Sequence, residues 1–173
     1  MRTRAHTIAT LTAAALLALT ACGTDSSDSS TNGADTPANS SSDNKSATPD
    51  AEQVVKALAD AITEAEAATV YTAKTDKNNL LGRPGGYTSK ADFTDVRAQP
   101  DLDDAVQKGG SVEVYDDPAD AKERVEFIAA TLKKMKIFGT EYHYLNDGVL
   151  LRVSGELTPD EAAGYEGALN ELD

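Results

Sequence analysis

The sequence contains one cysteine, Cys22, among its 173 residues. A disulfide within the chain is therefore excluded, as are zinc sites built from several thiolates. Histidine is nearly absent as well, because His143 is the only one beyond residue 21. The stability of the protein must come from an ordinary packed core, and few groups remain for nucleophilic or acid–base catalysis.

Long apolar runs are also missing. The longest runs from about residue 8 to residue 19, roughly 12 residues, whereas a membrane-spanning helix needs about 20. Arg2 and Arg4 precede this run, and small residues follow it. A charged start, an apolar middle and a small-residue cleavage site are typical of a secretory signal peptide, which we predict for residues 1–21.

The run Leu19-Thr20-Ala21-Cys22 resembles the lipobox of bacterial lipoproteins. This resemblance implies that signal peptidase cuts before Cys22 and that Cys22 carries acyl chains such as palmitate. Two chains contribute on the order of 20 kcal/mol of membrane affinity, at about 0.8 kcal/mol per buried methylene. The resemblance therefore predicts a lipoprotein that is anchored to the cell membrane at Cys22 and faces outside the cytoplasm.

Residues 22–47 lack the side chains that build a core. Between Gly23 and Ala47 there is no aromatic residue and no Leu, Ile or Val. Such a composition cannot bury enough apolar surface to offset the entropy of ordering. We expect a disordered tether with a span of about 25–30 Å, followed by a single domain over residues 48–173.

The chain is strongly acidic. All 29 Asp and Glu residues but only 14 of the 16 Lys and Arg residues lie after residue 21, so that part carries a formal charge of −15. A domain of this charge is soluble and is repelled by anionic lipid and by nucleic acid. We therefore expect no nucleic-acid partner.

Three predicted helix starts combine an oxygen-bearing side chain with proline. Thr48-Pro49, Asp117-Pro118 and Thr158-Pro159 each place an N-cap residue before proline at the first helical position. Thr158 and Glu161 also form a capping-box pattern. Apolar residues then recur every three to four positions. Lys133–Lys136 suits the C-terminal end of the second helix, and a basic ligand-binding patch is the alternative.

Between these helices the apolar period changes to two. The alternation predicts strands at 69–73, 87–95, 111–115, 141–145 and 149–154. Asp147-Gly148 is a strong hairpin signal between the last two strands. A two-residue loop there pairs Tyr144 with Leu151 on one face, and His143 with Arg152 on the other.

The order of these elements predicts an α+β domain with two layers. We expect an antiparallel sheet with helices packed on one face. The C-terminal half, from residue 111 to residue 172, reads β-α-β-β-α and is compatible with a ferredoxin-like arrangement.

The most unusual internal segment is the loop 74–90. It is locally positive by three charges in an acidic protein, and it contains Gly82, Gly85 and Gly86 around Pro84. Glycines allow close backbone approach, and basic side chains receive carboxylate or phosphate groups. The alternative is a surface turn that only joins two strands. If the loop is functional, the predicted contact residues are Lys77, Arg83, Tyr87 and Lys90.

Other candidate sites are poorly supported. The acidic clusters at 101–104 and 116–120 lack the ligand spacing of a calcium loop, so no metal or cofactor is expected. His143 has no Gly-x-Ser-x-Gly elbow beside it, and Ser89 and Lys90 point to opposite faces of a strand. An enzyme is therefore not expected.

The segments 109–115 and 150–154 resemble parts of uncharacterised small lipoproteins of Gram-positive bacteria, over about residues 71–169. That resemblance implies a compartment but no catalytic residue. The sequence predicts an envelope lipoprotein with a non-enzymatic domain that binds a protein or small ligand through the 74–90 loop and the adjacent sheet edge. A small-ligand sensor or carrier, which requires a cavity, and a wall-active hydrolase are the alternatives.

Overall fold

The computed structural model describes residues 48–99 and 103–172, so the predicted signal peptide, Cys22 and the tether lie outside the described residues. Its elements are α1 (Ala51–Ala61), β1 (Ala65–Val70), β2 (Ser89–Asp95), β3 (Gly109–Val114), α2 (Pro118–Lys134), the 3₁₀ helix η1 (Lys136–Phe138), β4 (Glu141–Asn146), β5 (Val149–Ser154) and α3 (Pro159–Asn170). Within the described ranges, no helix is both long and apolar enough to cross a bilayer.

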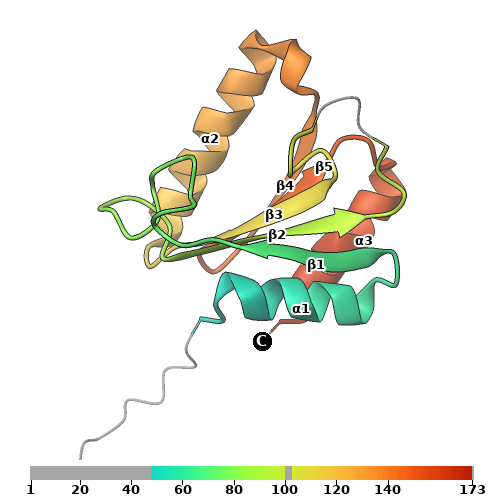
Figure 1. Cartoon of the computed structure of the whole chain (residues 1–173), viewed down its shortest axis with the longest axis horizontal. Helices are drawn as coiled ribbons and strands as arrows, with labels where there is room; N and C mark the ends of the chain where they lie inside the picture. Colours follow the sequence, from blue (N-terminus) through green and yellow to red (C-terminus); the bar gives the residue numbers. More distant parts are fainter. Residues whose placement is uncertain (1–47, 100–102, 173) are drawn as a thin grey trace, which may run out of the picture. The chain divides into compact units, whose positions relative to one another are not determined.

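The five strands form one antiparallel sheet in the order β1-β2-β3-β5-β4. Three helices pack against it (Figure 1). The predicted α+β class and the antiparallel sheet are therefore confirmed.

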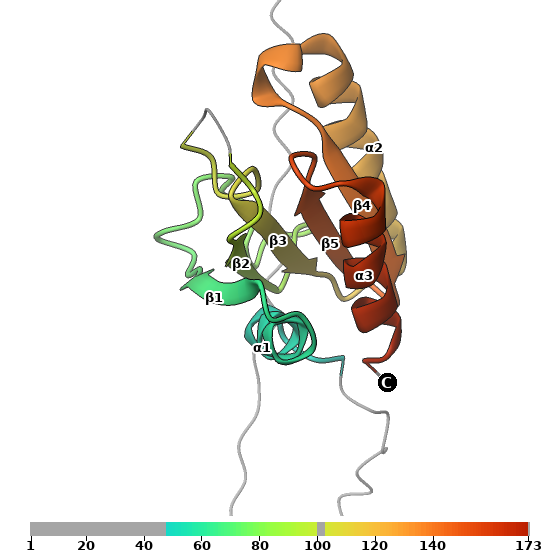
Figure 2. The same cartoon turned by 90° about the vertical axis from the view of Figure 1, so that its right-hand side faces the viewer.

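The helices do not share one face of the sheet, so that part of the prediction is wrong. Val112 and Leu151 point toward α1 and α3, whereas Leu150 points toward α2. Figures 1 and 2 show α2 on the side of the sheet opposite α1. The reason is that β5 carries apolar side chains on both faces, and each face needs cover.

The opposite placement of α2 and α3 also rules out the ferredoxin-like arrangement, in which both helices cover the same face. The predicted order of elements is nevertheless present, because β3, α2, β4, β5 and α3 follow one another as expected. Strand periodicity identifies the elements but does not say which face each helix covers.

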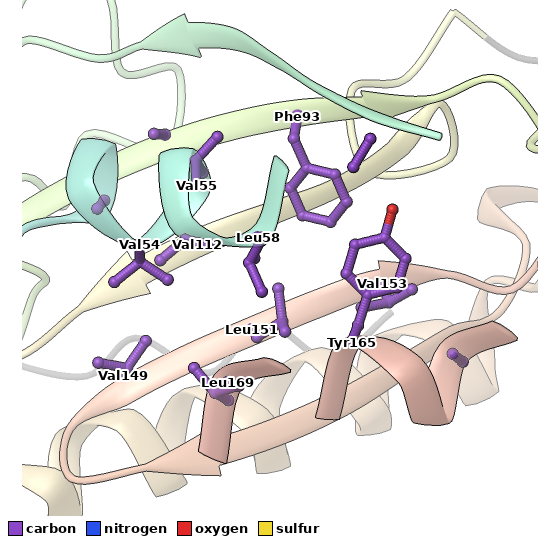
Figure 3. Close-up of a cluster of buried hydrophobic side chains, with 14 of the residues drawn as sticks. Val54, Val55, Leu58, Phe93, Val112, Val149, Leu151, Val153, Tyr165 and Leu169 are labelled. Carbon is purple, nitrogen blue, oxygen red and sulfur yellow. The ribbon is translucent and has the colours of Figure 1, made fainter. Parts of the chain in front are cut away.

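The larger core lies between the sheet and helices α1 and α3 (Figure 3). The ring of Phe93 stacks on Tyr165 with centroids 5.1 Å apart, and the Tyr165 hydroxyl donates a 2.6 Å hydrogen bond to Asp95. Position 110 must be glycine, because a Cβ there would lie 2.2 Å from the Phe93 ring. This close approach lets β3 pass beneath the aromatic pair.

A smaller core lies under α2. Tyr87 and Tyr115 meet edge to face with centroids 5.9 Å apart, beside Ile128 of α2 and Leu150 of β5. This cluster covers only part of the second face of the sheet. The remainder of that face carries charged side chains.

Two of the three predicted helix caps are confirmed. Asp117 accepts from the backbone N–H of Ala119, and Thr158 forms a capping box with Glu161. The first helix instead begins two residues later than predicted, with Asp50 rather than Thr48 as the N-cap. Asp50 is preferred because Gln53 returns a hydrogen bond to its backbone N–H, which Thr48 cannot obtain.

The predicted hairpin is confirmed with its register. Asp147 and Gly148 both have positive φ, of 40° and 83°, as a type I′ turn requires. Tyr144 lies opposite Leu151, and His143 opposite Arg152. The strand predicted at 69–73 instead occupies 65–70, because β1 is an exposed edge strand whose sequence has no period-two apolar pattern.

Candidate functional site

The second face of the sheet holds a cavity of about 330 Å³ beneath α2. Figure 1 shows α2 rising away from β1 and β2, and residues of α2 and β2 line the cavity together with Tyr71, which follows β1. Its apolar wall includes Phe127, Ile128 and Leu132 of α2. Its floor includes Lys90 and Asp92 of β2. A volume of this size lies at the lower end of the range for small-molecule sites.

Two other hollows are larger, at about 430 and 400 Å³. One lies on the other side of Arg124 and Phe127, and the other lies near Thr48 and Ser89. Neither contains a buried polar atom without a hydrogen-bond partner among the described residues. The cavity above β2 is therefore the better candidate site, although it is not the largest.

Alternation along β2 sends two charged side chains to the cavity. Ala91 and Phe93 enter the α1 core, so Lys90 and Asp92 point to the opposite face. Their residues are only 9% and 3% exposed. Lys and Asp are rarely buried to this extent unless they are paired. Their burial therefore needs an explanation.

Tyr71 joins these two side chains. Its hydroxyl donates a 2.5 Å hydrogen bond to Oδ2 of Asp92, and its ring lies 4.4 Å from Nζ of Lys90. Burial, together with the hydrogen bond to the Asp92 carboxylate, raises the pKa of Tyr71 well above its usual value. Tyr71 therefore stays a neutral donor at physiological pH.

A chain of ionic contacts crosses the sheet beside the cavity. Arg124 of α2 contacts Glu113 at 3.0 Å, and Arg152 contacts Glu113 at 3.3 Å and Glu141 at 2.7 Å. Glu141 also contacts His143 at 3.1 Å. This network fastens α2 to three strands and satisfies the charges of both arginines.

The carboxylates of this network remain ionised. Burial would raise the pKa of Glu113, but hydrogen bonding to Arg124 and the charges of both arginines lower it below its usual value. Burial likewise opposes ionisation of Glu141, yet hydrogen bonds from His143 and Arg152 lower its pKa to about 2. The network is therefore a set of charges compensated within the protein.

The loop after β1 is organised around Asp76, which the sequence analysis did not identify. Its carboxylate accepts hydrogen bonds from the backbone N–H groups of Asn78, Leu80 and Leu81 and from the hydroxyl of Tyr87. Burial opposes ionisation, but these bonds hold the pKa of Asp76 below its usual value. The loop is thus a folded structure rather than a loose turn.

The structure separates the four predicted contact residues. Lys77 and Lys90 both line the cavity. Tyr87 is fully buried and donates to Asp76, so it supports the loop from inside and offers no surface to a partner. Arg83 is exposed, bonds to Asn79, and does not line the cavity.

The residues that sequence reasoning missed are Tyr71, Asp92 and Phe127. Polar residues at alternate positions 90 and 92 of a strand were a signal that could have been followed. That signal has meaning only once α2 is known to cover this face.

The remaining candidates are not brought together. Among the described residues, neither His143 nor a serine lines the cavity above β2, and His143 is held by Glu141. Within residues 48–99 and 103–172, no group of three potential ligands from His, Cys, Asp and Glu is placed to hold a metal ion.

Comparison of the chain with protein-family models, with curated proteins and with solved structures finds no match in any of the three.

Proposed function

We propose that this chain is a lipid-anchored protein of the bacterial envelope whose domain binds a small ligand, without chemistry, in the cavity between α2 and the sheet. The observation that carries the binding proposal is the floor of this cavity, where Asp92 is buried with one carboxylate oxygen unpartnered among the described residues. Buried polar atoms are normally hydrogen-bonded, so an orphan beside a cavity marks a place for a ligand group.

The cavity favours a small-ligand carrier or sensor over the other functions that the sequence left open. A carrier or sensor required a cavity between sheet and helix, and one of about 330 Å³ is present. Capture of a protein by the 74–90 loop is less well supported, because Tyr87 is buried and Arg83 lies away from the cavity. A wall hydrolase is disfavoured because the described residues that line the cavity include neither His143 nor a serine.

The anchor part of the proposal rests on residues 1–22, which lie outside the described residues. Mass spectrometry of the chain extracted from membranes should find an N-terminus at Cys22 that carries acyl chains. An unprocessed chain that starts at Met1 and is recovered from the cytosol would contradict the anchor and leave the cavity proposal standing.

Filling the cavity tests the binding proposal. The full chain should be screened by thermal shift against amino acids, organic acids, amines, sugars and nucleosides. At concentrations well above Kd, at least one should raise Tm by about 2 °C or more. Thr131→Trp places an indole in the cavity that Thr131 lines, and the shift should disappear.

Ala130→Trp is the matched control, because Ala130 is the exposed neighbour on the same helix and does not line the cavity. It should keep the ligand-induced shift. The proposal fails if no compound shifts the parent chain, or if Thr131→Trp responds as the parent does.

A further inference from the structure

The floor of the cavity presents two opposite charges, Lys90 and Asp92, that form no ion pair with any described residue. Oδ1 of Asp92 is the only buried side-chain N or O atom without a hydrogen-bond partner among the described residues. The ammonium group of Lys90 forms no hydrogen bond or ion pair with any described residue, and it lies over the face of the Tyr71 ring. Both side chains line the same cavity.

These two charges do not neutralise each other. They project from the same face of β2 two residues apart, where Cα atoms are about 6.6 Å apart, yet no ion pair joins them. Tyr71 lies between them, because its hydroxyl is bonded to Asp92 and its ring faces Lys90. The ring thus helps to hold the ammonium and the carboxylate apart as two separate binding groups.

The neighbouring arginines are already compensated, whereas Lys77 and Asp104, which also line the cavity, are exposed to solvent. Arg124 and Arg152 are bonded to Glu113 and Glu141, and Asp103 near the cavity mouth is paired with Lys108. A molecule that reaches the buried floor of the cavity therefore meets one cation, Lys90, and one anion, Asp92, that form no ion pair with the described residues. Its most complementary polar end carries an anion for Lys90 and a charged hydrogen-bond donor for Asp92.

The opposite wall of the cavity is apolar. Phe127, Ile128 and Leu132 of α2 line it, and Phe138 of η1 adds a further aromatic ring. A hydrocarbon group placed against this wall is removed from water while the polar end rests on β2.

We propose that the ligand is a zwitterion with an apolar substituent, of the class of free α-amino acids with aliphatic or aromatic side chains. Its carboxylate binds Nζ of Lys90, its ammonium binds Oδ1 of Asp92, and its side chain lies against α2. This inference rests on the proposed function and narrows it to one class of ligand. A cavity of about 330 Å³ holds one such molecule.

A molecule with a single charge can pair with only one of the two charged groups on the cavity floor. A monocarboxylate would leave the Asp92 oxygen unpartnered, and a monoamine would leave the Lys90 ammonium without an acceptor. A neutral sugar could reach both groups but would leave the apolar wall uncovered. The zwitterion is the class that matches all three features together.

The test compares three probes of one shape on the full chain: L-leucine, 4-methylpentanoate, which lacks the amine, and 3-methylbutylamine, which lacks the carboxylate. L-phenylalanine and glucose complete the set. Calorimetric titration should give L-leucine or L-phenylalanine the highest affinity. Loss of either charged group should weaken binding by at least about tenfold, because each removes a charge-assisted hydrogen bond.

Two variants test which protein side chain binds the ammonium of the ligand and which binds its carboxylate. Asp92→Asn keeps an oxygen to accept from Tyr71 but removes the carboxylate charge, so it should abolish the preference for L-leucine over 4-methylpentanoate. Lys90→Met keeps the apolar stem, and it should abolish the preference for L-leucine over 3-methylbutylamine. Lys122→Met, an exposed lysine of α2, is the control and should retain both preferences.

A merely structural role of the two residues would weaken all probes equally, and that result would overturn the inference. Equal affinities of the three matched probes for the parent chain, or binding of glucose alone, would also overturn the inference. These measurements use only the parent chain, so they do not depend on whether a variant folds. If none of these probes binds but Thr131→Trp still blocks another compound, the ligand class is wrong and the proposed function stands. If nothing binds, both are wrong.

Discussion

Replacement of Glu113 by alanine is expected to lower the free energy of unfolding by about 3–5 kcal/mol. Glu113 is fully buried, and its carboxylate accepts from Arg124, Arg152 and the hydroxyl of Tyr115. Alanine removes the carboxylate that compensates Arg124 and leaves Arg152 with Glu141 alone. It also leaves a cavity in the sheet.

Urea unfolding of the full chain measures this effect. Glu123→Ala is the matched control, because Glu123 is an exposed glutamate one residue before Arg124 and forms no ion pair with another described residue. It should change stability by less than about 0.5 kcal/mol. A loss below about 1 kcal/mol for Glu113→Ala would show that α2 is held by its apolar contacts instead.

Acid is expected to destabilise the protein as the pH falls from about 4.5 to 2. The pKa of Glu141 falls from 4.5 to about 2 on folding, so the unfolded chain binds the proton first as the pH decreases. This stabilisation, roughly 3 kcal/mol, is fully present above about pH 4.5 and is lost as the pH falls toward 2. About 2 kcal/mol of it is already lost at pH 3. Glu113 and Asp76, with pKa values that are also lowered, act in the same direction.

Urea midpoints measured between pH 7 and pH 3 check this dependence. Glu141→Gln removes one titrating group and should flatten the profile, although the variant is less stable at pH 7. Glu156→Gln, an exposed glutamate, should leave the profile unchanged. A Glu141→Gln profile that parallels the parent would show that Glu141 does not contribute to acid sensitivity.

Local features of the fold could be predicted because they depend on neighbours in sequence. The caps at Asp117 and Thr158 require only residues within one helical turn. The hairpin at Asp147-Gly148 requires only positive φ at its two turn residues, and the pleat then fixes the cross-strand pairs. The error at Thr48 was also local, since Thr48 and Asp50, two residues apart, both carry a side chain that can cap a helix.

The site was predicted only in part because its residues are far apart in the chain. Lys77 and Lys90 were selected for their charge in a glycine-rich loop, and both line the cavity. Tyr87 was selected with them, but the fold uses it to hold Asp76. Asp92 and Phe127 come from β2 and α2, and nothing in the sequence indicates that these elements face each other.

By itself, the sequence determined the antiparallel α+β class, two helix caps and the hairpin register, and it supplied the run Leu19-Thr20-Ala21-Cys22 whose resemblance to a lipobox supports the anchoring proposal. These follow from short-range chemistry, in which a pattern and its physical consequence lie within a few residues. Only the tertiary structure decided that α2 covers the second face of the sheet. That placement buries Lys90 and Asp92 beside an apolar wall, because side chains that alternate along β2 must face whatever helix lies above them.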